Sequence, residues 1–249
     1  MIRWDKTRVA PSRTHHLTAD GVPLYPARFA EVLSFHAPGL AAARDASGAF
    51  HIGPSGKPAY ARRFTRSYGF YDGLAAVEEA GRAFHILPDG TDLGPERYAW
   101  CGNFQGRRCT VRGVGGEYFH VDLTGKPLYP ERHAYAGDFR EGIAVVQEQT
   151  GYHMHIGGDG RPLNGRRFLD LDVFHKGYAR ARDACGWHHV NREGEPAYAC
   201  RFAAAEPFYN GQSRVEREDG ALEIIDERGI TVCRLPQPVE PASGPYAGG

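Results

Sequence analysis

Short runs of alternating apolar and polar residues recur along the chain, each centred on a histidine. Phe50-His51-Ile52 is a clear example, with an aromatic and a β-branched residue on either side of the imidazole. Alternation with a period of two predicts a β-strand whose histidine lies on the opposite face from its apolar neighbours. Six such histidines follow one another at intervals of 34 or 35 residues: His16, His51, His85, His120, His155 and His189.

An arginine follows each of these histidines 12 residues later, which gives a second series with the same spacing. Its members are Arg28, Arg63, Arg97, Arg132, Arg167 and Arg201. Two series locked together at one period indicate an array of a single repeated unit. We place the starts of these units near residues 15, 50, 84, 119, 154, 188 and 222, with Glu223 at the histidine position of the last one.

The rest of the unit is built from turn signals and two further strand patterns. A glycine stands five residues after each histidine, as in Pro54-Ser55-Gly56, and predicts a hairpin turn. A short strand is expected next, with a proline near its start and in most units a tyrosine at its end. After the arginine loop and an aromatic position comes a strand of small residues, Gly-x-Ala-x-Val, as at 73–77.

The sequence therefore predicts an all-β protein. We expect a propeller-like ring of six or seven short three-stranded antiparallel blades, with an open β-solenoid as the alternative. One repeat domain is expected over residues 1–236, followed by a flexible tail over 237–249 that is rich in Pro, Gly and Ala. The 32 glycines and 17 prolines interrupt the chain too often for long helices.

Composition narrows the functional classes. The 30 basic and 30 acidic residues give zero formal net charge, which argues against nucleic-acid and membrane partners. The first 16 residues lack the apolar segment of a secretory signal, and no run is long enough for a spanning helix. Five cysteines without a CxxC motif indicate reduced thiols. We therefore expect a cytoplasmic protein.

When the repeats are aligned on the histidine, the pattern of their aligned positions, or columns, resembles the bacterial WG-type repeat family. An aromatic-glycine element, Gly-x-Ala-x-Val, Gly-aromatic and Gly-x-Pro-x-Tyr follow in the order of that family across residues 15–232. Gly186-Trp187 and Gly151-Tyr152 stand where the family has its name-giving dipeptide. The resemblance implies an all-β repeat module and carries over no catalytic residue.

Residues that every unit contains are interpreted first as structural. We expect the histidine column to satisfy backbone carbonyls or neighbouring hydroxyls, and the arginine column to brace the long loop. The alternative is that the histidines surround an axial ligand or metal, and that the arginines with them bind anions. No P-loop, GxSxG or HExxH motif is present.

Residues that depart from the repeat are the candidates for function. His153 and His155 form an HxH pair on one strand face, about 7 Å apart, and with His189 they make a candidate transition-metal site. The irregular third unit suggests a ligand cleft with Trp100 and Arg108 at its wall. The other candidate ligand-binding residues are His36, His175, Trp187 and His188.

Our leading functional hypothesis is a non-enzymatic binding or scaffold module without a cofactor. It would recognise a protein, a peptide or a small anionic ligand through loops on one face. The alternative is an enzyme with a His/Arg site, with or without a metal, at the ring axis or on a loop face. A purely structural subunit would instead present a large flat apolar patch.

Overall fold

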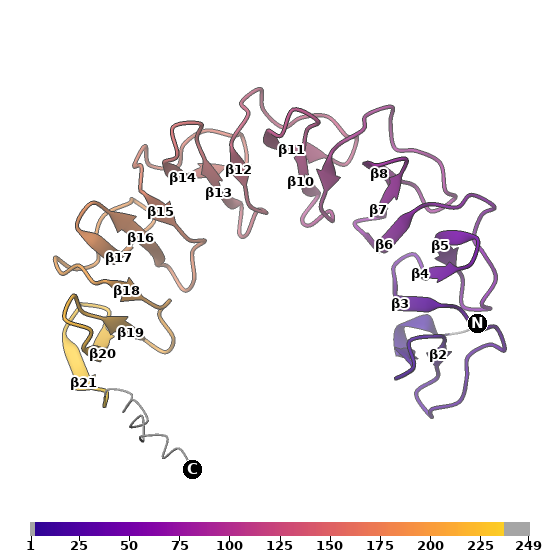
Figure 1. Cartoon of the computed structure of the whole chain (residues 1–249), viewed down its shortest axis with the longest axis horizontal. Helices are drawn as coiled ribbons and strands as arrows, with labels where there is room; N and C mark the ends of the chain where they lie inside the picture. Colours follow the sequence, from indigo (N-terminus) through magenta and orange to yellow (C-terminus); the bar gives the residue numbers. More distant parts are fainter. Residues whose placement is uncertain (1–2, 237–249) are drawn as a thin grey trace, which may run out of the picture. The chain divides into compact units, whose positions relative to one another are not determined.

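The computed structural model describes residues 3–236, and its regular structure is almost entirely β (Figure 1). A single turn of 3-10 helix, η1 (Trp4–Lys6), precedes the strands. Within residues 3–236, no helix has the length and apolar character needed to cross a membrane. The tail expected over 237–249 lies outside the described residues.

Seven small antiparallel sheets follow one another along residues 3–236. The first is two-stranded, β1 (Arg8–Val9) with β2 (His16–Leu17). The next three are β3 (Glu31–His36), β4 (Leu40–Asp45), β5 (Gly48–Ile52); β6 (Arg66–Tyr71), β7 (Leu74–Glu79), β8 (Arg82–Ile86); and β9 (Trp100–Cys101), β10 (Arg108–Arg112), β11 (Tyr118–Asp122). The last three are β12 (Tyr135–Ala136), β13 (Ile143–Gln147), β14 (His153–Gly157); β15 (Asp170–Leu171), β16 (Ala179–Asp183), β17 (Gly186–Val190); and β18 (Ala204–Ala205), β19 (Gln212–Glu216), β20 (Leu222–Asp226), β21 (Thr231–Arg234).

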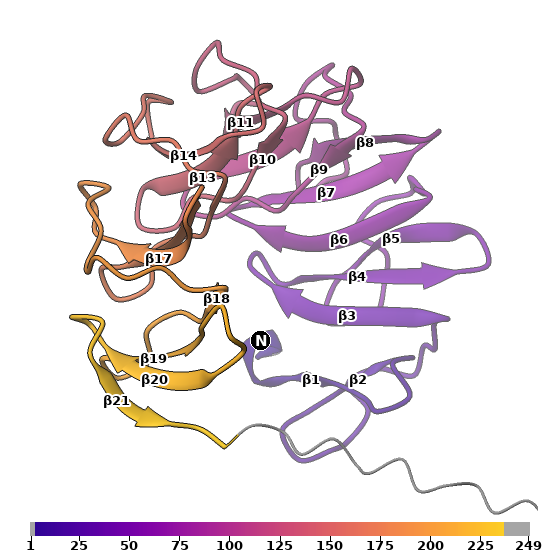
Figure 2. The ribbon, with the colours of Figure 1, turned by 60° about the vertical axis from the view of Figure 1, so that its left-hand side comes forward.

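The prediction of an all-β array of short antiparallel sheets is confirmed. The residues group into two compact units, one formed by Met1–Gly151 with Ile156–Arg161, the other by Tyr152–His155 with Pro162–Gly249. In the first unit, Figure 2 shows β3, β4 and β5 as adjacent strands, with β6 and β7 beside them. The closed arrangement of the sheets stays a prediction.

One strand differs from the prediction in each of the five three-stranded sheets, whereas the last sheet has the predicted strand as β21 and β18 in addition. The proline-containing segment after the histidine turn makes only a single bridge, as between Ile52 and Pro58, and is not a strand. The equivalent segment of the third repeat has Asp92 at the bridge position and also makes a single bridge, to Ile86, so proline is not required for the ladder to stop there. The third strand is instead the segment that precedes the small-residue strand, such as β3 or β6.

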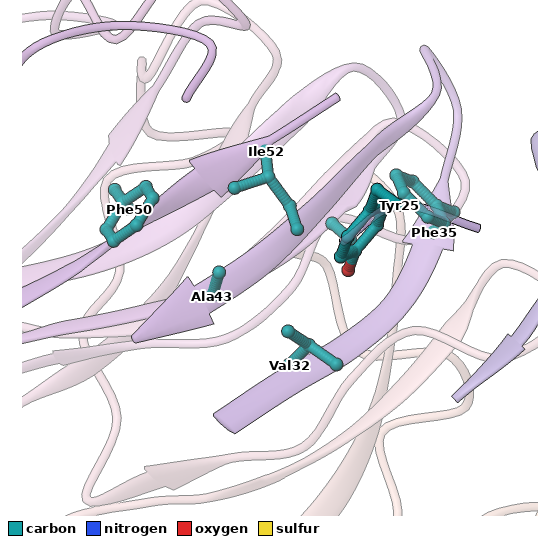
Figure 3. Packing of buried hydrophobic residues seen from close by; sticks show 7 residues of the cluster. Tyr25, Val32, Phe35, Ala43, Phe50 and Ile52 are labelled. Carbon is teal, nitrogen blue, oxygen red and sulfur yellow. The ribbon is translucent and has the colours of Figure 1, made fainter. Parts of the chain in front are cut away.

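The core of each sheet is built from the apolar positions that flank the histidine. In the sheet β3–β4–β5, Phe50 and Ile52 pack with Val32, Phe35 and Ala43 from the neighbouring strands (Figure 3). Ile52 is fully buried, and Phe50 is 1% exposed. Small residues in the middle strand leave room for the large side chains on both sides. Each sheet core joins residues of two successive repeats, so hydrophobic burial within single sheets stabilises the array.

Glu223 occupies a different column from the one expected. It pairs with Val215, whereas Ile224 pairs with Arg214 as His189 pairs with Arg180. Ile224 is therefore at the histidine position, and Glu223 stands where other units have Phe50 or its equivalents. The sequence alone gives no register, and a shift of one residue exchanges the two faces of a strand.

The buried carboxylate of Glu223 is held by basic and hydroxyl groups. Its side chain is only 1% exposed and accepts hydrogen bonds from Arg217 at 2.8 Å, Arg234 at 3.1 Å and Thr231 at 2.8 Å. The hydrogen bond from Arg217 is the main cause that lowers the pKa of Glu223. The last sheet therefore replaces an aromatic core residue with an ion pair.

We expect Arg217→Ala to lower the free energy of unfolding by about 2 kcal/mol, because the carboxylate of Glu223 loses its hydrogen bonds from Arg217 and keeps only those from Arg234 and Thr231. Urea unfolding at pH 7 measures the loss. Arg228→Ala is the control, since Arg228 is 78% exposed and its pair with Asp226 should contribute less than about 1 kcal/mol. Equal losses in the two variants would contradict the role given to the buried pair.

Candidate functional site

The repeated histidines are buried and hydrogen-bonded to the backbone. Each Nε2 lies 2.7–3.0 Å from the carbonyl oxygen of the residue 17 positions later, as for His51 and Tyr68. A carbonyl only accepts, so Nε2 carries the proton and Nδ1 is an acceptor. The rings are 4% exposed or less. This geometry holds the start of the following sheet against the histidine strand.

Four of the six histidines also accept a hydrogen bond from a tyrosine. The hydroxyl of Tyr25 donates to Nδ1 of His16 at 2.5 Å, and Tyr198 donates to His189 at the same distance. The pairs His51 with Tyr60 and His120 with Tyr129 repeat the contact. His85 and His155 have Gly94 and Asn164 at the tyrosine position.

The arginine column braces the loop that precedes each new sheet. Arg28, Arg63, Arg97, Arg132 and Arg201 donate to carbonyls one to three residues earlier in the chain. Three of these guanidinium groups lie 3.9 Å from the ring centroid of Phe50, Phe84 or Phe119. Hydrogen bonds and cation–π contacts thus occupy the arginines within their own repeats.

The candidate metal ligands are not arranged around a common point. His155 donates to the carbonyl of Asp172 at 2.9 Å, His189 is bonded at both ring nitrogens, and Nδ1 of His153 lies 3.2 Å from the carbonyl of Leu169. Residues 3–236 contain no group of three His, Cys, Asp or Glu that could hold a metal ion.

Four of the candidate ligand-binding residues lie apart from the third repeat. His36 packs on Tyr71 with 4.6 Å between ring centroids, and His175 packs on Tyr209 at 5.0 Å. Trp187 is partly buried, with Arg180 at 5.3 Å from its ring. His188 is 1% exposed, because its position on β17 faces the core of the sheet, so a ligand does not reach it in this conformation.

The third repeat contributes a hollow of about 350 Å³ that Trp100 lines. Tyr118 of β11 and Tyr135 of β12 add two more aromatic rings, with 5.5 Å between their centroids. Arg112, at the end of β10, supplies a guanidinium group, and Asp138 supplies a carboxylate. Trp100 is 43% exposed and Tyr135 is 48% exposed, so both rings are accessible.

Strand register explains why these side chains gather. Arg112 pairs with Trp100 on β9 and with Tyr118 on β11, so the three residues form one row across the sheet. Side chains directly opposite one another on adjacent strands lie on the same face. The guanidinium carbon of Arg112 is 5.9 Å from the ring centroid of Tyr118.

Arg112 differs from the charged residues in the equivalent rows of the sheets β3–β4–β5 and β6–β7–β8. In β3–β4 the row pairs Glu31 with Arg44 at 3.9 Å, and in β6–β7 it pairs Arg66 with Glu78 at 3.8 Å. In the third row Trp100 stands where the partner charge would be. Arg112 makes no ion pair within residues 3–236, and its buried Nε makes no hydrogen bond there.

The hollow corrects part of the predicted cleft. Trp100 lines it as expected, but Arg108 does not, because it lies at the other end of β10, with its guanidinium carbon 4.8 Å from the ring centroid of Phe139. Sequence reasoning missed Arg112, Tyr118, Tyr135 and Asp138. The sequence did contain one signal for this site. The first two repeats have opposite charges at the two equivalent positions, whereas the third repeat has Trp100 and Arg112 there.

Two other hollows lie between neighbouring sheets in the described chain, and the arginines that line them have acidic partners. One of about 490 Å³ is lined by Arg44 and Arg66, which have Glu31 and Glu78 as partners. Another of about 170 Å³ contains Arg214, which bonds Glu206 at 2.9 Å. The hollow of the third repeat thus combines aromatic walls with a guanidinium that lacks an acidic partner.

Comparison with known proteins gives similar solved structures but no similar sequence. No protein-family model matches the sequence, and no curated protein is significantly similar to it. Similar solved structures include BamB from Moraxella catarrhalis, with 13% identity, a TM-score of 0.47, and 94% of this chain and 86% of that chain covered.

The computationally designed Ika8 protein has 12% sequence identity and a TM-score of 0.45, and the match covers 92% of this chain and 85% of that chain. The WD40 β-propeller domain of Doa1 has 14% sequence identity and a TM-score of 0.35, and the match covers 83% of this chain and 82% of that chain.

Proposed function

We propose that this chain is a non-enzymatic binding module of the WG-repeat type, which recognises a protein, a peptide or a small anionic ligand. The observation that carries the proposal is the unpaired guanidinium of Arg112 between Trp100 and Tyr118. A carboxylate from outside the chain would take the place that Glu31 has beside Arg44 in the first repeat. A guanidinium binds a carboxylate with two parallel hydrogen bonds.

The walls of the hollow define the rest of the ligand. Trp100, Tyr118 and Tyr135 offer aromatic surface that would pack on a planar or apolar group. No histidine lines the hollow, which favours binding over acid–base chemistry at this place. We further propose a cytoplasmic location, on the basis of five free cysteines, and partners other than nucleic acid or membrane, on the basis of zero net charge.

Titration of the full chain with 3-phenylpropionate, followed by calorimetry, tests the proposal. We expect saturable binding that Arg112→Gln weakens by about tenfold or more, since hydrogen bonds to charged groups are worth about 1.5–3 kcal/mol. Arg44→Gln is the matched control, because it removes the equivalent arginine of the first repeat. Binding that is absent, or equally weakened by both substitutions, would contradict the assignment.

A further inference from the structure

The carboxylate of Asp138 is the second charged group in the hollow of the third repeat. It accepts a hydrogen bond from the hydroxyl of Thr110 at 2.7 Å, which fixes its position. It makes no ion pair within residues 3–236, as Arg112 makes none, and the two side chains are not paired with each other. The hollow therefore presents one unpaired positive and one unpaired negative group.

The register fixes how these two groups are separated. Thr110 and Arg112 are two residues apart on β10, so their side chains leave the strand on the same face, about 7 Å from each other. Asp138 is bonded to Thr110 and comes from the segment that follows β12. A guanidinium and a carboxylate are thus presented at neighbouring points on one wall.

From this arrangement we propose that the ligand is a small zwitterion with a planar ring, of the aromatic α-amino acid class. Its carboxylate binds Arg112, its ammonium group donates to Asp138, and its ring lies against Trp100 and Tyr135. This assignment rests on the proposed binding function and adds to it the requirement for a positive group. The hollow of about 350 Å³ has the size of a small-molecule site.

Neither charged group alone would select such a ligand. A simple aromatic acid leaves Asp138 without a partner and brings a second negative charge close to it, which weakens binding. A simple aromatic amine leaves Arg112 unpaired and brings two positive charges together. The zwitterion compensates both charges, so we expect it to bind more tightly than either.

The test compares three probes on the full chain by calorimetry: phenylalanine, 3-phenylpropionate and 2-phenylethylamine. We expect phenylalanine to bind about tenfold more tightly than the other two. Asp138→Asn, which keeps an acceptor for Thr110, should remove that advantage and leave the affinity for 3-phenylpropionate unchanged or higher. Arg112→Gln should weaken phenylalanine and 3-phenylpropionate alike.

The outcomes separate the two proposals. If 3-phenylpropionate binds as tightly as phenylalanine and Asp138→Asn has no effect on either, the zwitterion assignment is wrong and the anion-binding function stands. If 2-phenylethylamine binds best, both are wrong, because Arg112 is then not the anchor. If none of the three probes binds, the hollow is not a site for small aromatic ligands and both proposals are wrong. Glu31→Gln, at the acid of the first repeat, serves as the control for loss of a surface carboxylate.

Discussion

Acidification from pH 7 to pH 5 is expected to unfold this protein cooperatively. Burial lowers the pKa of His51, His85, His120, His155 and His189 to about 4, against 6.5 for an exposed imidazole. The folded chain keeps these rings neutral, while the unfolded chain protonates them below pH 6.5. The unfolded state therefore binds more protons, and stability falls as the pH decreases from about 6.5 to about 4.

The size of the effect follows from the number of histidines. Each ring that is protonated only in the unfolded state costs about 1.4 kcal/mol per pH unit, so five cost about 7 kcal/mol per unit. Between pH 6.5 and pH 5 the loss amounts to about 10 kcal/mol, so a domain whose stability lies in the middle or lower part of the usual range of about 5–15 kcal/mol would be unfolded near pH 5. Urea unfolding at half-unit steps from pH 7.5 to 5 measures this slope.

Protonation of carboxylates could also destabilise the protein at low pH, but it would do so in a different pH range from protonation of the histidines. The pKa of Asp92 and of Asp183 is lowered from an ordinary value of 3.8, so their contribution is lost at still lower pH than that of the histidines. A stability that is constant down to pH 4.5 would contradict the histidine explanation. NMR of the imidazole nitrogens provides a second check, since His51, His85, His120, His155 and His189 should be neutral at pH 6 with the proton on Nε2.

Repeat spacing was enough to predict most of the fold. The alternation around His51 and its equivalents predicted the strand, the burial of its apolar neighbours and the opposite direction of the imidazole. It could not predict which segments pair with that strand, because pairing depends on backbone donors in other parts of the unit. The proline segment is an example, since it makes one bridge at Pro58, as the equivalent segment of the third repeat does at Asp92.

The candidate site was predictable only in part, for a related reason. Trp100 was noticeable because it breaks the repeat, whereas Arg112 is an ordinary arginine until it is aligned with Arg44 and Glu78 across their strands. That alignment needs the register of three segments from one repeat. The lack of an acidic partner for Arg112 is thus visible only when the residues opposite it on the neighbouring strands are known.

Gly56→Ala is expected to be among the most destabilising single-methyl changes in this chain. The ring of Tyr25 packs directly on the backbone of Gly56, and a Cβ added there would lie 2.7 Å from Cγ of the ring. Tyr25 cannot move away freely, because it is 4% exposed and its hydroxyl is bonded to His16, which is bonded in turn to the carbonyl of Leu33. The substitution therefore disturbs the contact between two successive repeats.

The backbone of Gly56 adds a second cost, and a matched control separates the two. Gly56 has a φ of +74°, and Gly81 has a φ of +73° with no atom within 4 Å of an added Cβ. We expect Gly81→Ala to cost about 1 kcal/mol for the left-handed conformation alone. Gly56→Ala should cost about 2–4 kcal/mol, because overpacking in a buried site typically adds about 1–3 kcal/mol to the backbone cost.

Chemical unfolding of the two alanine variants, and of both in a Tyr25→Ala background, completes the test. Once the ring is removed, Gly56→Ala should cost no more than Gly81→Ala, because only the backbone term remains. A cost that stays high without Tyr25 would mean that the turn itself, and not its contact with the preceding repeat, is the sensitive element. The same logic applies to Gly90 beneath Tyr60 and Gly229 beneath Tyr198, so the tyrosine–glycine contact is a recurring connection between repeats.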